Sequence, residues 1–378
     1  MQAVELGGWH KPAAAPVATV SEVTEREDFV ALKDEWNTLV RASNDHFFYR
    51  HEFIQIWLDH FAPQSRLRVL LGRDAAGTLV AALPLLEESA SICGVTVRQL
   101  SGTSNAHSCR FDFLALDPPA AARALLSYLG ADERWDVLRL VDVPKTGAAM
   151  ALLEAAAALD MPYGSWDSQR SPYLALPTTI EAFEEALGKR FRASLRRRRR
   201  RLSELGKVEV ERVEGGGELA KKLAEGFEVE RSGWKGKNGT AIVQSPQTHG
   251  FYSTLGYFSA AGGYLSAYFL RLDGRAVAFD FAVTYGQRYL TLKPAYDEAH
   301  HMVSPGQLLT EDSLRACIQA GVTELDFLGN ATPCKLDWTQ TVRPHAWLYL
   351  FRGTPKGRML CSAKFSLLPA AKRLLKGG

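Results

Sequence analysis

The stretch Ser304-Pro305-Gly306-Gln307 has the composition of a helix start that could hold phosphate oxygens. Serine favours the N-cap, proline the first helical position, and a glutamine three residues after the cap completes a capping-box pattern. Gly321 predicts the end of this helix. Free N–H groups and the positive end of the helix dipole bind anions, and Gly306 lets a ligand approach the backbone closely. The same pattern is also typical of a capped helix without a ligand.

A second unusual stretch is basic, since residues 189–201 carry nine positive charges, six of them consecutive arginines, and no acidic residue. Because the whole chain carries only +3, the residues outside this window sum to −6. The dispersed basic surface expected of a DNA-binding domain is therefore absent. Phe191, Leu195, Leu202 and Leu205 recur near helical spacing, which predicts an amphipathic helix with arginines around the rest of its circumference.

The elements that must position these residues occur twice along the chain. A hairpin pattern over 66–88, with its turn at Asp74–Gly77, is matched by a second over 264–298, with its turn at Asp273-Gly274. In each half the pattern then predicts a strand, a helix and a strand, at 111–115, 117–130 and 135–143 in the first half and at 289–292, 304–321 and 322–329 in the second. This shared order predicts a duplicated α/β unit, with chance similarity as the alternative.

Length and composition indicate two globular domains, because the chain has 378 residues, of which 46% are hydrophobic and 23% charged. We expect a flexible leader over 1–17, domains over 18–178 and 179–350, and a basic amphipathic tail over 351–378, with the basic helix at 189–205. The five cysteines form no C-x-x-C pair, which indicates reduced thiols in a cytoplasmic protein and offers no zinc ligand set. Neither a secretion signal nor an apolar run of about 18 residues is recognisable.

Several motifs occur in an order that resembles the CelD/BcsL-type acyltransferases, a branch of the GNAT superfamily related to the FemAB-type double-GNAT ligases. The matching residues are the basic helix Leu195–Leu202, Glu230 and Arg231 with Trp234, Ala295–Asp297, Ser304–Gly306, and Asp326–Gly329 followed by Lys335 and Trp338. The first half is family-like in Trp36 and in the segments 47–57 and 83–87, so the resemblance runs from about residue 20 to about residue 350. Cys334 stands where the family usually has tyrosine, so a role of that hydroxyl as proton donor is in doubt.

The resemblance implies an α/β fold with mixed sheets in tandem GNAT-like domains, the second of which binds acyl-CoA as co-substrate without a metal. It implies cofactor-binding residues at Val303, Ser304, Pro305, Gly306 and Gln307, and substrate-binding residues at Glu230, Arg231, Trp234 and Tyr296.

Acyl transfer to an amine requires a general base, because only the neutral amine attacks. Candidates near the expected cleft are His300 and His301, whose ordinary pKa suits the task, and Asp280 in an apolar strand. Asp326 ends a strand beside the site and is expected to pair with Lys335. The alternatives are that the histidines face solvent, that Asp280 points outward from an edge strand, and that Asp326 and Lys335 form a structural ion pair.

The sequence thus predicts an acyl-CoA-dependent N-acyltransferase acting on an amine of a lipid or saccharide. The most specific form is ceramide-synthase-like acylation of a sphingoid base, because bacterial ceramide synthases resemble this superfamily. Two alternatives are FemAB-like aminoacyl transfer from tRNA and a non-catalytic GNAT-scaffold module in exopolysaccharide or lipid assembly.

The basic stretches 189–205 and 356–376 could contact an anionic membrane surface, which would place a cytoplasmic protein at the periphery of the inner membrane. The alternatives are a basic helix docked on the protein, an anionic-cofactor surface, and a tail packed on the protein's own core. Nucleic acid is the least favoured partner, because no aromatic residues for base stacking are interleaved with the arginines.

Overall fold

The computed structural model describes residues 16–367, apart from the side chains of Trp234 and Lys235. The first half contains β1 (Thr19–Val23), α1 (Arg26–Ala31), α2 (Lys33–Ala42), η1 (Phe47–Tyr49), α3 (His51–Phe61), β2 (Arg66–Arg73), β3 (Leu79–Ile92), β4 (Val95–Gly102), β5 (Leu114–Ala115), α4 (Pro118–Gly130), β6 (Val137–Pro144), η2 (Ala148–Met150), α5 (Ala151–Ala158) and β7 (Tyr163–Ala175). The second half contains α6 (Ile180–Ala186), α7 (Lys189–Leu205), β8 (Val208–Val213), α8 (Leu219–Ser232), α9 (Trp234–Lys237), η3 (Ile242–Gln244), α10 (Pro246–Ala261), β9 (Ala267–Leu272), β10 (Arg275–Tyr285), β11 (Arg288–Tyr296), η4 (Glu298–Val303), α11 (Pro305–Gln319), β12 (Glu324–Asp326), α12 (Pro333–Leu336), β13 (Val342–Phe351), α13 (Pro355–Ser362) and η5 (Ala363–Leu367).

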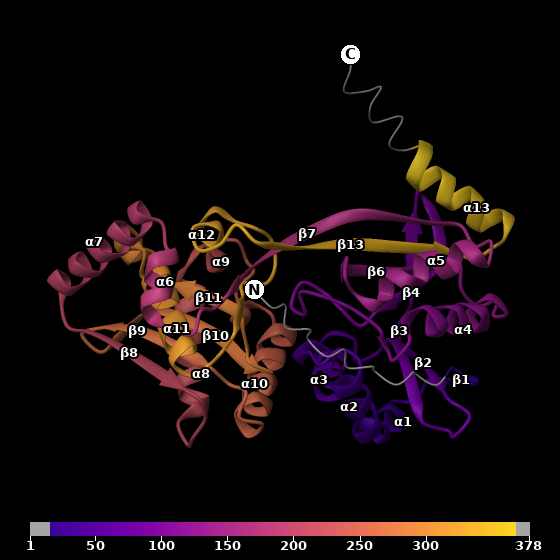
Figure 1. The fold of residues 1–378 in the computed structure, drawn as a ribbon, viewed down its shortest axis with the longest axis horizontal. Coiled ribbons are helices and arrows are strands. Elements are labelled where there is room, and N and C mark those ends of the chain that lie inside the picture. Colours follow the sequence, from indigo (N-terminus) through magenta and orange to yellow (C-terminus); the bar gives the residue numbers. More distant parts are fainter. Residues whose placement is uncertain (1–15, 368–378) are drawn as a thin grey trace, which may run out of the picture.

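The strands of both halves belong to one mixed sheet. Within the described residues it has 13 strands in the order β1-β2-β3-β4-β6-β13-β7-β12-β11-β10-β9-β8, with β5 paired to β3. The long strands β7 and β13 run side by side between the two halves (Figure 1). β7 pairs with β13 over most of its length, and its last three residues, 173–175, pair with β12 of the second half. β13 follows the second half in sequence but lies between β6 and β7 of the first.

Helices cover both faces of each half (Figure 1). One apolar core combines α1–α3 of the first half with α8 and α10 of the second, and it includes the buried residues Trp36, Phe53, Phe227 and Phe251. A second core lies between α4, α5 and the first half of the sheet, and a third between α6, α7, α11 and the second half. The two halves therefore share one core and one sheet.

The duplicated order predicted from sequence is present. In both halves an antiparallel hairpin leads to a parallel strand pair joined by a helix, β4-α4-β6 in the first half and β11-α11-β12 in the second. One predicted correspondence is wrong, because the segment 111–115 forms only the short strand β5, which pairs with β3. The counterpart of β11 is β4, and an irregular loop over 103–113 separates it from β5.

The described part of the predicted tail packs on the first half. Leu360 of α13 is buried, and Phe365 of η5 contacts Trp166 and Tyr349. The Lys364 ammonium lies 4.3 Å from the centre of the Trp166 ring. The remaining predicted tail residues, 368–378, lie outside the described residues. No helix within residues 16–367 is long and apolar enough to cross a membrane.

A buried ion cluster joins the halves at the end of β12. Asp326 is 0% exposed and accepts hydrogen bonds from Arg110 of the 103–113 loop and from Arg343 of β13, the latter at 2.6 Å. The Leu328 N–H also donates to this carboxylate at 2.8 Å. Arg110 of the first half and Arg343 of β13 thus meet at one carboxylate, although Arg110 lies 216 residues from Asp326 in sequence.

Replacing Asp326 with Asn should strongly destabilise the fold, because it leaves the buried Arg110 guanidinium without its counter-charge. Breaking one partner of a buried pair typically costs about 3–5 kcal/mol. Urea unfolding followed by circular dichroism measures the change. The control is Glu218→Gln, because the Glu218–Lys221 pair is exposed and such pairs contribute roughly 0–1 kcal/mol. Equal midpoints for the two variants would contradict the structural role of the cluster.

Candidate active site

A large cavity, with a volume of about 710 Å³, adjoins the parallel strands β11 and β12 of the second half. It is lined by Ala106 and Cys109 of the first half, Glu230 and Gly233 at the end of α8, 291–296 of β11, Gly306, Gln307 and Thr310 of α11, 327–329 after β12, and Thr332, Cys334, Lys335 and Trp338 around α12. Most of its walls come from the second half, and the 103–113 loop of the first half closes one side.

The cavity exists because β11 and β12 pair over only three residues each, 288–290 with 324–326. Beyond this point β11 continues along β10, whereas the chain after β12 follows β7. The ladder between β10 and β11 shifts register so that Leu292 has no partner opposite it. Bulges of this kind re-aim backbone and side-chain groups next to active sites. The diverging strands leave a space with Leu292 on one wall and Phe327 on the other.

The start of α11 lies at one end of the cavity, but its predicted capping box is absent. Ser304 has a left-handed backbone, with φ 46° and ψ 62°, and its side chain makes no cap hydrogen bond. Pro305 has no N–H, and the N–H groups of Gln307 and Leu308 donate to the Ser304 carbonyl at 3.0 and 3.3 Å. Of residues 305–308, all within the described part of the chain, Gly306 is the one whose N–H is left for a ligand. The helix dipole adds to the attraction for an anion.

The Gln307 side chain holds α12 over the cavity. Its amide nitrogen donates to the Cys334 carbonyl at 2.9 Å, and its oxygen accepts a hydrogen bond from the Trp338 indole. The Trp338 ring packs edge-on against Phe191 of α7, with 4.9 Å between ring centres. Lys335 donates to the carbonyls of residues 328 and 330, which keeps its ammonium beside the cavity.

The opposite wall carries the charged pair Glu230 and Lys293. Glu230 is 1% exposed, and its carboxylate accepts a hydrogen bond from the Ile242 N–H at 2.7 Å. The Lys293 ammonium lies 3.9 Å from the other carboxylate oxygen and 5.3 Å from the centre of the Tyr252 ring. Burial raises the pKa of the nearby Cys109 thiol to about 11. The wall therefore presents a carboxylate, an ammonium and a neutral thiol to one cavity.

The expected pairing of Asp326 with Lys335 is wrong. The Asp326 carboxylate faces two guanidiniums, those of Arg110 and Arg343, and Lys335 donates to backbone carbonyls instead. A guanidinium fork satisfies a buried carboxylate with more hydrogen bonds than an ammonium can supply in the same geometry. Lys335 lines the cavity, whereas Asp326 lies behind its wall.

The candidate general bases do not line this cavity. His301 is exposed in η4, and the His300 Nδ1 lies 3.6 Å from the Asp297 carboxylate. Asp280 is buried in the interior strand β10, where it accepts a hydrogen bond from the Tyr289 hydroxyl at 2.8 Å. The structure thus leaves these three side chains outside the space where an acyl group could lie.

Of the residues that the resemblance implies as cofactor- or substrate-binding, some line the cavity and others do not. Gly306, Gln307, Glu230 and Tyr296 line the cavity. Val303 and Pro305 are buried, Ser304 turns the chain into α11, and Arg231 is exposed and paired with Glu228. The Trp234 side chain lies outside the described positions.

Sequence reasoning missed Lys293, Ala106 and Cys109. Lys293 lies three residues before Tyr296 on the same strand, and strand alternation predicts opposite faces for such residues, so spacing did not indicate Lys293. Ala106 and Cys109 carry no local signal, since the tertiary fold brings them from the first half to a cavity of the second.

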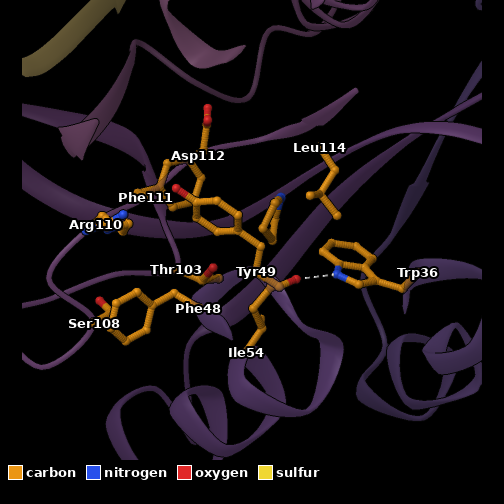
Figure 2. A pocket seen from close by; sticks show the side chains of 11 residues that line it. Trp36, Phe48, Tyr49, Ile54, Thr103, Ser108, Arg110, Phe111, Asp112 and Leu114 are labelled. Atoms are coloured by element: carbon orange, nitrogen blue, oxygen red, sulfur yellow. Dashed lines mark hydrogen bonds between the residues drawn. The ribbon is translucent and has the colours of Figure 1, made fainter. Parts of the chain in front are cut away.

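The equivalent opening of the first half is filled by its own chain. β4 and β6 also pair over only three residues, 99–101 with 137–139. The Phe111 N–H then donates to the Asp142 carbonyl of β6 at 3.3 Å, and its ring packs on Gly102. The Asp112 carboxylate accepts hydrogen bonds from the N–H groups of residues 148 and 149 at the start of η2. Beside this loop lie a space of about 10 Å³ lined by residues such as Phe111 and Asp112 (Figure 2) and, toward the start of α4, a cavity of about 490 Å³ lined by residues such as Phe113 and Pro118.

Comparison with known proteins agrees with this geometry. Residues 189–336 match the family described as Acetyltransferase (GNAT) domain, so most of the second half is similar to this family. This match covers all of the residues that line the cavity except Ala106, Cys109 and Trp338. Within curated proteins, no sequence matches the chain.

Solved structures resemble the whole chain at low identity. FemX is 10% identical with a TM-score of 0.57, over 90% of this chain and 100% of FemX. The C-terminal domain of a putative lysylphosphatidylglycerol synthetase from Agrobacterium fabrum is 12% identical with a TM-score of 0.50, over 86% and 96% of the two chains. L-PGS from Bacillus licheniformis is 11% identical with a TM-score of 0.50, over 88% and 95%. Together with the duplicated elements, these similarities identify the fold as tandem GNAT-like.

Alkylation of Cys109 should require a high pH. With a pKa of about 11, only about one Cys109 thiol in a thousand is ionised at pH 8, and the thiolate is the reactive form. The rate of modification by iodoacetamide, followed by peptide mass spectrometry, should rise about tenfold per pH unit between pH 8 and 10. The exposed Cys93 provides the comparison. Modification of Cys109 as fast as that of Cys93 at pH 8 would show that its thiol is not desolvated.

Proposed function

We propose that this protein is an acyl-CoA-dependent N-acyltransferase whose second half holds the thioester. One observation carries the proposal, namely the cavity of about 710 Å³ where β11 and β12 of the GNAT domain diverge. Gly306 and Gln307 lie on its α11 side, and Glu230 and Lys293 lie on its wall toward α8. The reaction would therefore take place between an anion-binding helix start and a buried carboxylate.

The acyl-CoA would lie with its phosphates toward α11 and its thioester between the diverging strands. The Gly306 N–H, the dipole of α11 and the Lys335 ammonium offer positive potential to phosphate oxygens. Leu292, Phe327 and Leu328 offer apolar contacts to the pantetheine and acyl chain. Proximity of the acceptor to the thioester then accounts for part of the rate.

The proposed chemistry uses Glu230 as general base. Its carboxylate takes a proton from the acceptor ammonium, and the neutral amine nitrogen attacks the thioester carbonyl carbon. As the carbon–sulfur bond of the tetrahedral intermediate breaks, the extra proton on its nitrogen passes to the departing sulfur, which leaves a neutral amide and the CoA thiol. The Lys293 ammonium lies 3.9 Å from Glu230 and holds its carboxylate next to the cavity. The positive charge of Lys293 also offsets the repulsion between this carboxylate and the negative charge that develops on the sulfur.

The acceptor we favour is a lipid amine of the sphingoid-base class. The apolar walls and the volume of the cavity suit long hydrocarbon chains, and the resemblance to bacterial ceramide synthases supports the same class.

FemAB-like aminoacyl transfer from tRNA is a second candidate, favoured by the exposed arginines of α7. Binding of tRNA that weakens steeply with salt, together with aminoacyl transfer, would support it over the use of CoA. A non-catalytic scaffold predicts no turnover with any thioester and amine. The substrate test below separates the three functions.

Replacing Glu230 with Gln should lower the turnover of acyl-CoA with a sphingoid base by roughly 10²- to 10⁴-fold, the usual contribution of a general base. The amide keeps an acceptor for the Ile242 N–H, so the fold should survive. Release of CoA thiol and formation of amide are measured together. Glu228→Gln is the matched control, because Glu228 is exposed on the same helix. Near wild-type turnover of the Glu230 variant would remove the assigned role.

Binding of CoA should protect Cys334 from iodoacetamide without protecting Cys93. Both thiols are exposed, but Cys334 lines the cavity and Cys93 lies in the turn between β3 and β4. Quantitative peptide mass spectrometry with and without CoA gives the two rates. Equal rates for Cys334 with and without saturating CoA would contradict the proposed binding mode.

A further inference from the structure

Helix α7 contains the arginine run, and one face of it belongs to the core. Leu195 and Leu202 are buried against the second half of the sheet and α11. The Arg199 guanidinium donates to Asp312 at 2.8 and 2.9 Å and to Glu311 at 3.1 Å. This arginine therefore fastens α7 to α11 and is not available to a partner.

The opposite face of α7 carries a stripe of exposed side chains, which we call the arginine stripe and define as Arg190, Arg197, Arg201 and Leu205. Spacings of seven and four residues place these positions on one side of a helix. All three arginines are exposed, and Leu205 is 58% exposed.

The charge of the arginine stripe is not neutralised by the protein. The ion pairs found within residues 16–367 include none of Arg190, Arg197 and Arg201. Nearby acidic side chains already have partners, since Glu204 pairs with Arg200, and Glu184 and Glu311 pair with Arg315. The stripe keeps a local charge of +3 on a chain whose net charge is also +3.

We propose that the arginine stripe docks the protein on an anionic lipid bilayer. A bilayer presents many phosphates in one plane, which suits a straight row of arginines, and Leu205 at the end of the row can enter the interfacial region. The described residues of the stripe include no aromatic ring on which a nucleic-acid base could stack. Charge and shape together therefore favour a lipid surface over nucleic acid.

The position of the stripe connects this surface to the cavity. Phe191, one residue after Arg190, packs against Trp338, and Trp338 lines the cavity. A bilayer bound at α7 would lie near the α11 end of the site. α13 lies at the far end of the molecule's long axis from α7 (Figure 1), so the stripe can act without the described part of the tail.

The test uses the full-length protein and sedimentation with vesicles. One set contains equal parts of phosphatidylcholine and phosphatidylglycerol, and the other contains phosphatidylcholine alone. Wild-type protein should sediment with the anionic vesicles at low salt, and added salt should release it because it screens the attraction. Each arginine near an anionic surface raises partitioning about fivefold, so R190Q/R197Q/R201Q should weaken it roughly 100-fold.

The matched control is R41Q/R123Q/R170Q, which removes the same charge from three exposed arginines of the first half. Thermal melts should show both triple variants folded, because none of the six arginines belongs to an ion pair within residues 16–367. An equal loss of binding by the control would show that net charge alone is responsible and would overturn the proposal.

Two further outcomes would also overturn the proposal. Wild-type protein could fail to sediment with anionic vesicles at low salt, or it could bind tRNA more tightly than these vesicles through the same three arginines. Sedimentation does not depend on turnover, so failure of the membrane surface and failure of the proposed acyl transfer are distinguishable.

Discussion

The buried carboxylate of Asp326 constrains the rest of the structure more than any other group. A charge with no access to water must be matched by fixed partners, and here the partners come from two distant segments, at Arg110 and Arg343. The same residue ends the short pairing of β12 with β11. The ion cluster therefore fixes where the two strands separate, and the width of the candidate active site depends on it.

The two halves show how diverging parallel strands can border a large cavity or have the gap between them occupied by the chain itself. Both contain parallel strands that pair over three residues and then diverge. In the first half, Phe111 occupies the gap and the Asp112 carboxylate takes the place of an anion at a helix start. Burial raises the pKa of Asp112 to about 6, even though several backbone N–H groups donate to it. The loop that fills the first opening also contributes Cys109 to the second.

Periodicity and turn residues were sufficient to predict the duplicated order of elements, and the resemblance pointed to Gly306, Gln307 and Lys335, which line the cavity. Sequence spacing could not predict the left-handed backbone of Ser304, which replaces the expected capping box. Nor could it predict that guanidiniums, rather than Lys335, would surround Asp326. The Ser304 conformation depends on a local turn. The Asp326 cluster depends on contact with Arg110, which lies 216 residues away in sequence. Neither feature leaves a periodic pattern in the sequence.

The position of β13 affects how the chain can be made. Its residues are synthesised after α6–α12 of the second half, yet they form an interior strand of the sheet of the first half. Domains usually fold in order as they leave the ribosome. Here the sheet of the N-terminal half stays incomplete, with the β6 edge unpaired, until residue 351 has left the ribosome. A nascent chain of this kind is expected to need protection from aggregation until β13 has paired with β6.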